Sequence, residues 1–144
     1  MKKITSVLCC VILTLIVLAG CAASLKRYKP KSPDEAAIKE LLIKWETSWN
    51  NQDVKGVLML LNEQAEVMYR IGKDRKFATK KEYKHMLLER MKVVLNLKLG
   101  SPKIKVSGNK ADVFVDIKVG NAKTAFTYHL VKENGSWSIM GWDY

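Results

Sequence analysis

Cysteine and histidine are scarce in this chain of 144 residues. The three cysteines, Cys9, Cys10 and Cys21, all lie near the N-terminus, whereas the two histidines, His85 and His129, lie far apart. From residue 22 onward no disulfide can form, so the stability of that part must come from packing. Two histidines on different elements, without a cysteine nearby, argue against a zinc site.

Several catalytic and nucleotide-binding motifs are absent, and acidic residues are few. The sequence has no Gly-x-Ser-x-Gly element, phosphate-binding loop or dinucleotide fingerprint, so we expect no cofactor. It carries 14 acidic residues against 25 Lys and Arg. Without Lys2 and Lys3, which precede a long uncharged run, 23 basic residues remain and the net charge is +9. This balance favours an anionic partner, such as nucleic acid, lipid head groups or cell-wall polymers.

The N-terminal segment narrows that choice. After Lys2 and Lys3 the chain is uncharged from Ile4 to Ala19, a run shorter than the about 20 apolar residues of a membrane span and typical of a secretory signal. It ends in Leu18-Ala19-Gly20-Cys21, which resembles the lipobox of bacterial lipoprotein precursors. The resemblance implies that residues 1–20 are a signal peptide and that Cys21 becomes the lipid-carrying first residue.

Residues 21–31 then form a lipidated cysteine with a short basic tether. Four basic residues follow the attachment point and would each contribute about 1 kcal/mol on an anionic membrane, although a merely soluble tether explains them equally well: Lys26, Arg27, Lys29 and Lys31. We expect the lipid on Cys21 to hold the protein to a membrane, facing the periplasm or the exterior. Because such a domain would rarely meet nucleic acid, we expect no nucleic-acid partner.

Residues 32–144 predict one domain in which helices precede strands. Capping patterns predict three helices, which are Pro33 to about Asn50, Val54 to Leu61, and Lys80 to about Lys92. Alternation predicts a strand from Val67 to Ile71 with a return leg ending near Phe77, followed by a long antiparallel meander. Gly120-Asn121 and Asn134-Gly135 are two-residue hairpin signals within that meander.

The two hairpin signals fix a register and therefore two faces. Across Asn134-Gly135, Leu130 pairs with Ile139, Tyr128 with Gly141 and Phe126 with Asp143. The face expected to meet the helices then carries one acid, Asp143, among these apolar residues: Val113, Val115, Ile117, Phe126, Tyr128, Leu130, Trp137 and Ile139.

The opposite face is predicted to carry an apolar patch. Its members are Phe114, Met140, Trp142 and Tyr144, and they lie beside Asp112 and His129. Exposed patches of this kind often mark an interface, so we expect Phe114, His129, Met140 and Trp142 to contribute to one. His129 opposite Asp112 is expected to form a surface ion pair or an interface contact.

The order of elements resembles the nuclear transport factor 2-like superfamily, in particular its SnoaL-like and DUF4440-like members. The resemblance covers about Pro33 to Tyr144 and is carried by three segments: Trp45 and Trp49 before Asn50-Asn51-Gln52-Asp53, Thr79 to Tyr83, and the terminal Gly135-Ser136-Trp137-Ser138-Ile139. It implies an α+β, cystatin-like cone in which three N-terminal helices pack on a curved antiparallel sheet around an apolar pocket. Many members dimerise through the outer sheet face, which implies a homodimer.

Some enzymes of that superfamily hold a carboxylate general base inside the cone, with a tyrosine polarising the substrate. An acid in an apolar pocket gains a raised pKa, which this chemistry requires. The matching residues here are Asp143 with Tyr128 and Tyr69, although a penultimate acid is more often solvated. Trp45 and Trp49 would line the same pocket, as core or as ligand platform.

Three hypotheses follow for the function. The first is a membrane-anchored, non-enzymatic lipoprotein that binds a small apolar ligand or has an accessory role. The second is a small lyase or isomerase that uses Asp143 with Tyr128 or Tyr69. The third is a protein-interaction module that acts through the outer sheet face.

Overall fold

A computed structural model describes residues 24–71 and 73–143. The predicted signal peptide, Cys21 and Tyr144 lie outside the described residues. The helices and strands are η1 (Leu25–Arg27), α2 (Pro33–Asn50), α3 (Val54–Leu60), β1 (Glu66–Ile71), β2 (Asp74–Thr79), α4 (Lys80–Val93), β3 (Leu97–Leu99), β4 (Lys103–Ser107), β5 (Lys110–Val119), β6 (Ala122–Glu133) and β7 (Ser136–Asp143).

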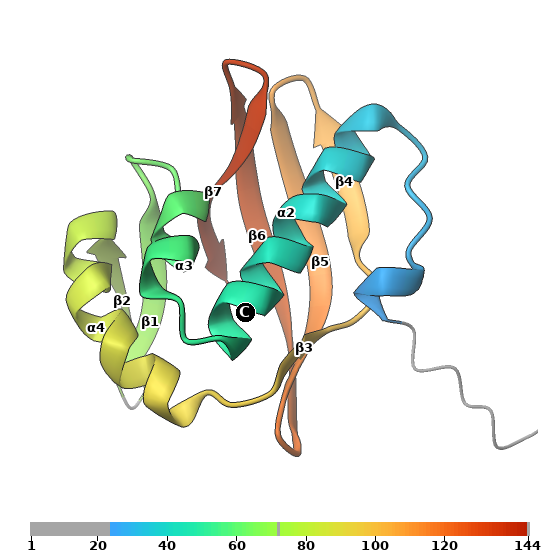
Figure 1. Cartoon of the computed structure of the whole chain (residues 1–144). Helices are drawn as coiled ribbons and strands as arrows, with labels where there is room; N and C mark the ends of the chain where they lie inside the picture. The colour runs from blue at the N-terminus through green and yellow to red at the C-terminus, as the bar shows by residue number, and fades with distance from the viewer. Residues whose placement is uncertain (1–23, 72, 144) are drawn as a thin grey trace, which may run out of the picture.

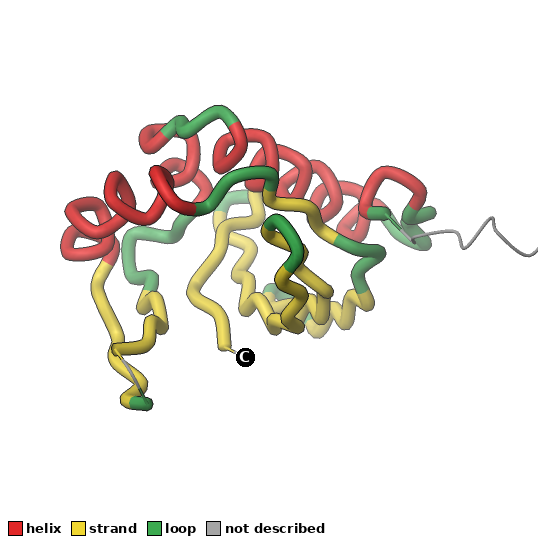
Figure 2. The backbone as a smooth tube through the Cα atoms, turned by 90° about the horizontal axis from the view of Figure 1, so that it is seen from below, coloured by secondary structure: helices red, strands yellow, loops and turns green. Residues whose placement is uncertain are grey.

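The helices and the sheet form two layers. Helices α2, α3 and α4 lie on one side of an antiparallel sheet, and the other side of that sheet is uncovered (Figures 1 and 2). The main sheet has the order β3-β5-β6-β7, with β4 also pairing with β5, while β1 and β2 form a separate hairpin beside β7. The predicted α+β architecture, three helices on a curved antiparallel sheet, is therefore confirmed.

Side-chain caps explain where the helices begin. The Ser32 hydroxyl accepts from the backbone N–H of Glu35 at 3.1 Å, and Pro33 occupies the first turn of α2. The Asp53 carboxylate accepts from the N–H of Gly56 at 2.8 Å at the start of α3. At α4, Thr79 and Glu82 cap each other reciprocally. Each contact satisfies an N–H that a helix start leaves without an intrahelical acceptor.

The two hairpin turns fall where the sequence predicts them, with Val119 paired to Ala122 and Glu133 paired to Ser136. The register across the second turn is correct as far as Leu130 and Ile139. A β-bulge between His129 and Leu130 then shifts the pairing by one residue.

The bulge reverses two predicted orientations. Tyr128 pairs with Trp142 in place of the predicted Gly141. Asp143 pairs with Thr127 in place of the predicted Phe126. Since residues directly opposite each other share a face, Trp142 points toward the helices and Asp143 points away from them. The predictions that Trp142 lies on the outer face and Asp143 in the interior are therefore wrong.

The segment predicted as a tether is folded for much of its length. Ser24 forms a β-bridge with Gly100, between β3 and β4. Leu25 is only 2% exposed and belongs to the hydrophobic core, and Lys39 of α2 donates to the carbonyls of Lys26 and Tyr28. The described packing therefore reaches back at least to Ser24, within the segment predicted as a tether.

The core lies between α2 and the inner face of the sheet, which carries the predicted apolar set from Val113 to Ile139. Among the described residues, every member of the core falls between Leu25 and Trp142. In the described part of the chain, each helix is too short or too polar to be a candidate membrane span.

Candidate functional site

Aromatic side chains occupy the space in which the sequence predicts a pocket. Trp45 of α2 lies at the centre of this group, with its ring centroid 5.8 Å from that of Tyr128 and 5.5 Å from that of Trp142. Tyr83 of α4 contacts Trp142 at 5.6 Å, and Trp49 contacts Trp45 at 6.0 Å, all in edge-to-face geometry. The five side chains are buried, and we call them the aromatic cluster.

Two polar groups of the cluster bond each other, and one has no partner. The Trp45 indole donates to the Tyr128 hydroxyl at 3.1 Å, so the predicted carbonyl-polarising tyrosine is already bound to a tryptophan. The Trp49 Nε1–H is buried and has no acceptor in the structure. An unsatisfied buried donor is unusual, since such groups are nearly always hydrogen-bonded.

Only part of the predicted ligand set comes together. Trp45, Trp49 and Tyr128 meet in the aromatic cluster. Tyr69 lies half-buried on β1, with the Arg90 guanidinium 5.7 Å from its ring centroid, and Asp143 lies on the opposite face of the sheet. The predicted trio of Asp143, Tyr128 and Tyr69 is therefore not assembled, because the bulge turns Asp143 out of the interior.

Asp143 instead joins a polar cluster on the outer face. The His129 imidazole of β6 bonds Asp112 of β5 through Nδ1 at 2.8 Å and Asp143 of β7 through Nε2 at 3.2 Å. The three side chains are about half exposed. Partial burial lowers the pKa of His129, but the hydrogen bonds and the attraction of the two carboxylates outweigh it, and the pKa is raised overall.

This outer cluster links β5, β6 and β7, and two of its members line a cleft. A cavity of about 360 Å³ separates β6 and β7 from the β1–β2 hairpin, which projects past the main sheet on the side away from the helices (Figure 2). Its lining includes Arg75, Phe77, His129, Met140 and Asp143. Both imidazole nitrogens are engaged by carboxylates, so His129 has no free nitrogen with which to act as a general base.

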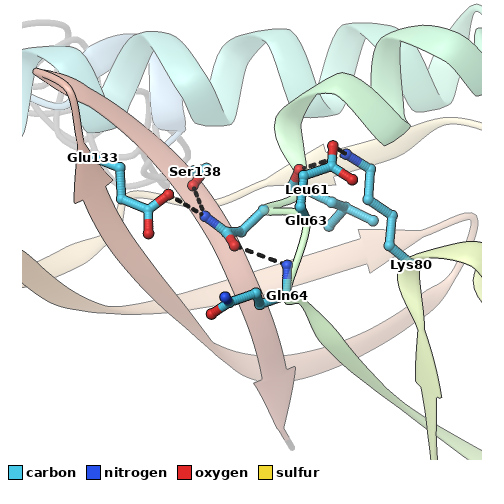
Figure 3. A network of polar contacts seen from close by, with 7 residues as sticks. Leu61, Glu63, Gln64, Lys80, Glu133 and Ser138 are labelled. Atoms are coloured by element: carbon cyan, nitrogen blue, oxygen red, sulfur yellow. Dashed lines mark hydrogen bonds and ion pairs between the residues drawn. The ribbon is translucent and has the colours of Figure 1, made fainter.

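A second hollow, of about 700 Å³, lies between α3, the start of α4 and β7. Figure 3 shows the polar network at its edge. The Asn62 side chain donates to Glu133 at 3.0 Å and to Ser138 at 3.1 Å, and it accepts from the N–H of Gln64 at 2.9 Å. Since Asn62 is 7% exposed and these bonds satisfy its amide, its role is to fasten the chain after α3 to β6 and β7.

No metal centre is found in the described ranges, 24–71 and 73–143, because they contain no group of three or more His, Cys, Asp or Glu arranged to hold an ion. The outer cluster contains two acids and a histidine, but the carboxylates bond the imidazole itself.

The outer face is more basic and less apolar than the sequence suggests. Phe114 is 48% exposed as predicted, and Met140 is half-buried at the bulge, but Trp142 is buried and removes the largest member of the predicted patch. The register places six lysines on this face: Lys98, Lys103, Lys105, Lys110, Lys118 and Lys123. We call this lysine-bearing surface the basic face.

The sequence matches no family model and no curated protein. Its structure is similar to an NTF2-like protein of unknown function from Shewanella baltica OS155, with a TM-score of 0.65, 15% identity, and coverage of 79% of this chain and 94% of that one. The chain has the nuclear transport factor 2-like fold. A cystatin-like protein from Nostoc punctiforme matches this NTF2-like chain with a TM-score of 0.62, 14% identity, and coverage of 79% of this chain and 91% of that one.

A third NTF2-like neighbour, from Shewanella frigidimarina, carries the provisional name ketosteroid isomerase. It matches with a TM-score of 0.60 and 17% identity, over 74% of this chain and 94% of that one. At these identities the likeness describes the fold alone.

Three features of this domain are not predicted from the sequence: the bulge, the basic face and the role of Asn62. Gly141 in the sequence indicates the bulge, because a glycine inside a strand often marks a bulge or a close approach of another backbone. The basic face also had a signal, because Lys103 and Lys105 alternate with apolar residues and therefore point the same way. The role of Asn62 has no comparable local pattern, since its partners lie about 70 residues away in the chain.

Proposed function

We propose that this chain is a membrane-anchored extracytoplasmic lipoprotein with a non-enzymatic, accessory role. The observation that carries the proposal is how close to Cys21 the described packing reaches. Ser24 and Leu25, three and four residues after the cysteine that the lipobox pattern predicts as the lipid attachment point, are already packed in the domain. A mature chain that starts at Cys21 would keep every core residue that the structure describes.

The interior supports a non-enzymatic role. The site predicted for catalysis is filled by Trp45, Tyr128 and Trp142, and its acid lies on the other side of the sheet. A general base must reach the proton that it abstracts, and Asp143, bonded to His129 on the outer face, lies across the sheet from the interior of the cone.

The anchor is tested by growing cells that express the full chain with a labelled fatty acid. The wild-type protein should take up label and appear in the membrane fraction at the mass of a chain cleaved before Cys21. A Cys21→Ser variant should keep its first 20 residues and remain unlabelled. A Cys10→Ser variant is the matched control and should be labelled like the wild type. Normal labelling of Cys21→Ser would refute the anchor.

Binding of a small apolar ligand in the cone is a second candidate, and the unpartnered Trp49 Nε1–H is the observation that favours it. A naphthalene-sulfonate dye reports accessible apolar cavities. The filled aromatic cluster predicts no saturable rise in dye fluorescence with the folded domain. A saturable rise that is lost in Trp49→Phe, while unfolding remains unchanged, would instead establish a ligand cavity.

A further inference from the structure

The basic face has charges that the fold leaves uncompensated. Asp112 and Asp116 share this face, but Asp112 is bound to His129 at 2.8 Å and Asp116 to Lys123 at 2.9 Å. Five exposed lysines of β3, β4 and β5 make no ion pair with any residue that the structure describes: Lys98, Lys103, Lys105, Lys110 and Lys118. These charges lie toward the β3–β4 edge of the sheet.

An exposed aromatic residue lies among these lysines. Phe114 is directly opposite Lys103 in the register and two residues from Asp112, which is opposite Lys105. Its side chain is 48% exposed. A surface that combines lysines with a protruding apolar side chain is suited to the boundary between head groups and acyl chains of a bilayer.

The chain enters the domain at the same edge. Ser24 bridges to Gly100, the residue that separates β3 from β4, and Lys26 and Arg27 of η1 follow at once and are exposed. Cys21 is three residues from Ser24, which allows at most about 10 Å between their Cα atoms. A lipid on Cys21 would therefore hold this edge within roughly one Debye length of the bilayer surface.

We infer that the basic face docks on an anionic lipid bilayer, so that the lipoprotein lies against the membrane in one orientation. The inference rests on the proposed lipid anchor for its geometry, and on the lysines and Phe114 for its chemistry. Figure 1 places α3 and α4 at the opposite end of the molecule from η1 and β4, and Figure 2 places the helices on the face of the sheet opposite the basic face, so α3 and α4 would point away from the bilayer. A second copy of the chain fits this face poorly, because like charges would meet.

Vesicle sedimentation tests the docking on a protein that lacks the lipid anchor. A chain that starts at Ala22 contains every core residue that the structure describes and can be checked for folding by circular dichroism. It should bind phosphatidylcholine vesicles that contain phosphatidylglycerol, should not bind phosphatidylcholine alone, and should be released by salt. Lys103→Gln with Lys105→Gln should weaken partitioning about 25-fold, at about fivefold for each lysine.

The matched control removes the same charge from the far side. Lys55→Gln with Lys84→Gln, on α3 and α4, should change partitioning less than about twofold. Equal losses in the two double variants would overturn the oriented surface, and no binding to the anionic vesicles would overturn the lipid partner. Binding to soluble poly(glycerol phosphate) but not to vesicles would replace it with a cell-wall polymer.

Orientation is measured on the lipidated protein. Because no cysteine follows Cys21, single-cysteine variants accept one fluorophore each. The fluorescence emission of a polarity-sensitive dye on Ser107→Cys of β4 should shift to the blue on anionic vesicles. The emission of the same dye on His85→Cys of α4 should not shift. Equal responses would overturn the docking. A failure of docking and a failure of the anchor are distinguishable, because failed lipidation appears separately as a Cys21 that carries no labelled fatty acid.

Discussion

Trp142 separates two interpretations of the last strand at the scale of one residue. As an outer-face residue it would contribute to an interface, and its replacement would alter association. The structure buries it to 7% exposure against Trp45, Tyr83 and Tyr128. Trp142→Ala should therefore lower the free energy of unfolding by about 3–5 kcal/mol in urea titrations, through lost packing and a residual cavity.

Phe114→Ala is the companion variant for this measurement, because Phe114 is a large aromatic residue that remains on the surface. Its removal should change the free energy of unfolding by no more than about 0.5 kcal/mol. A neutral Trp142→Ala would mean that the bulge is absent and that the register runs straight through to Asp143.

His129 provides a pH-dependent prediction. Its pKa is raised in the folded protein, so the stabilisation from Asp112 and Asp143 is present in full below the unfolded-state pKa of about 6.5 and is lost as pH rises through the higher folded-state value. The difference in unfolding free energy between wild type and His129→Gln should therefore shrink with rising pH. It should remain below about 1 kcal/mol, because the groups are half exposed.

The control for this titration is His85→Gln, which removes an exposed imidazole from α4. Its difference from wild type should not follow the curve of His129→Gln. A His129→Gln difference that grows between neutral and alkaline pH would contradict the arrangement of the outer cluster.

At the scale of elements, the approach of β1 to β7 depends on Gly141. A Cβ on this residue would lie 2.3 Å from the backbone oxygen of Glu66, which cannot move aside as a side chain could. Gly141→Ala should therefore destabilise the domain by about 1–3 kcal/mol through overpacking. Ser136→Ala, at the exposed start of the same strand, should be near neutral. Equal stabilities in urea would contradict the close approach of the hairpin.

The N-terminal segment is the other element whose role changes with the structure. Leu25 is 2% exposed, so Leu25→Ala should cost about 2–5 kcal/mol of unfolding free energy, whereas Leu88→Ala, at a position 55% exposed, should cost far less. A neutral Leu25→Ala would restore the long free tether and remove the geometric basis for docking.

The elements also show where prediction from sequence succeeds. Caps and hairpin turns are local, so Ser32, Asp53, Thr79 and the Asn134-Gly135 turn locate helices and strands correctly. The bulge is not encoded by a turn residue. It depends on whether the packing of Trp142 against Trp45 and Tyr83 stabilises the domain more than the disrupted strand pairing at the bulge destabilises it. That balance can be judged only once the helices are packed on the sheet.

At the scale of the whole molecule, the register shift between His129 and Leu130 determines which side chains fill the cone, and the proposed function depends on that filling. Turning Trp142 inward closes the cone, and turning Asp143 outward removes the predicted acid from it. What remains exposed is a sheet face that carries six lysines. The sequence correctly predicts the NTF2-like architecture, whereas the filling of the cone depends on a one-residue change of register between β6 and β7. A basic domain of this kind matches an anionic boundary better than an apolar substrate.

The lipid anchor is the central claim about the molecule, and the intact mass of the protein from detergent-extracted membranes tests it most directly. We predict a chain from Cys21 to Tyr144 whose mass exceeds that of its amino acids by a diacylglyceryl group, with or without a further acyl chain. Fragmentation should place the added mass on Cys21. A membrane-extracted protein with its first 20 residues intact, or an unmodified Cys21, would contradict the account.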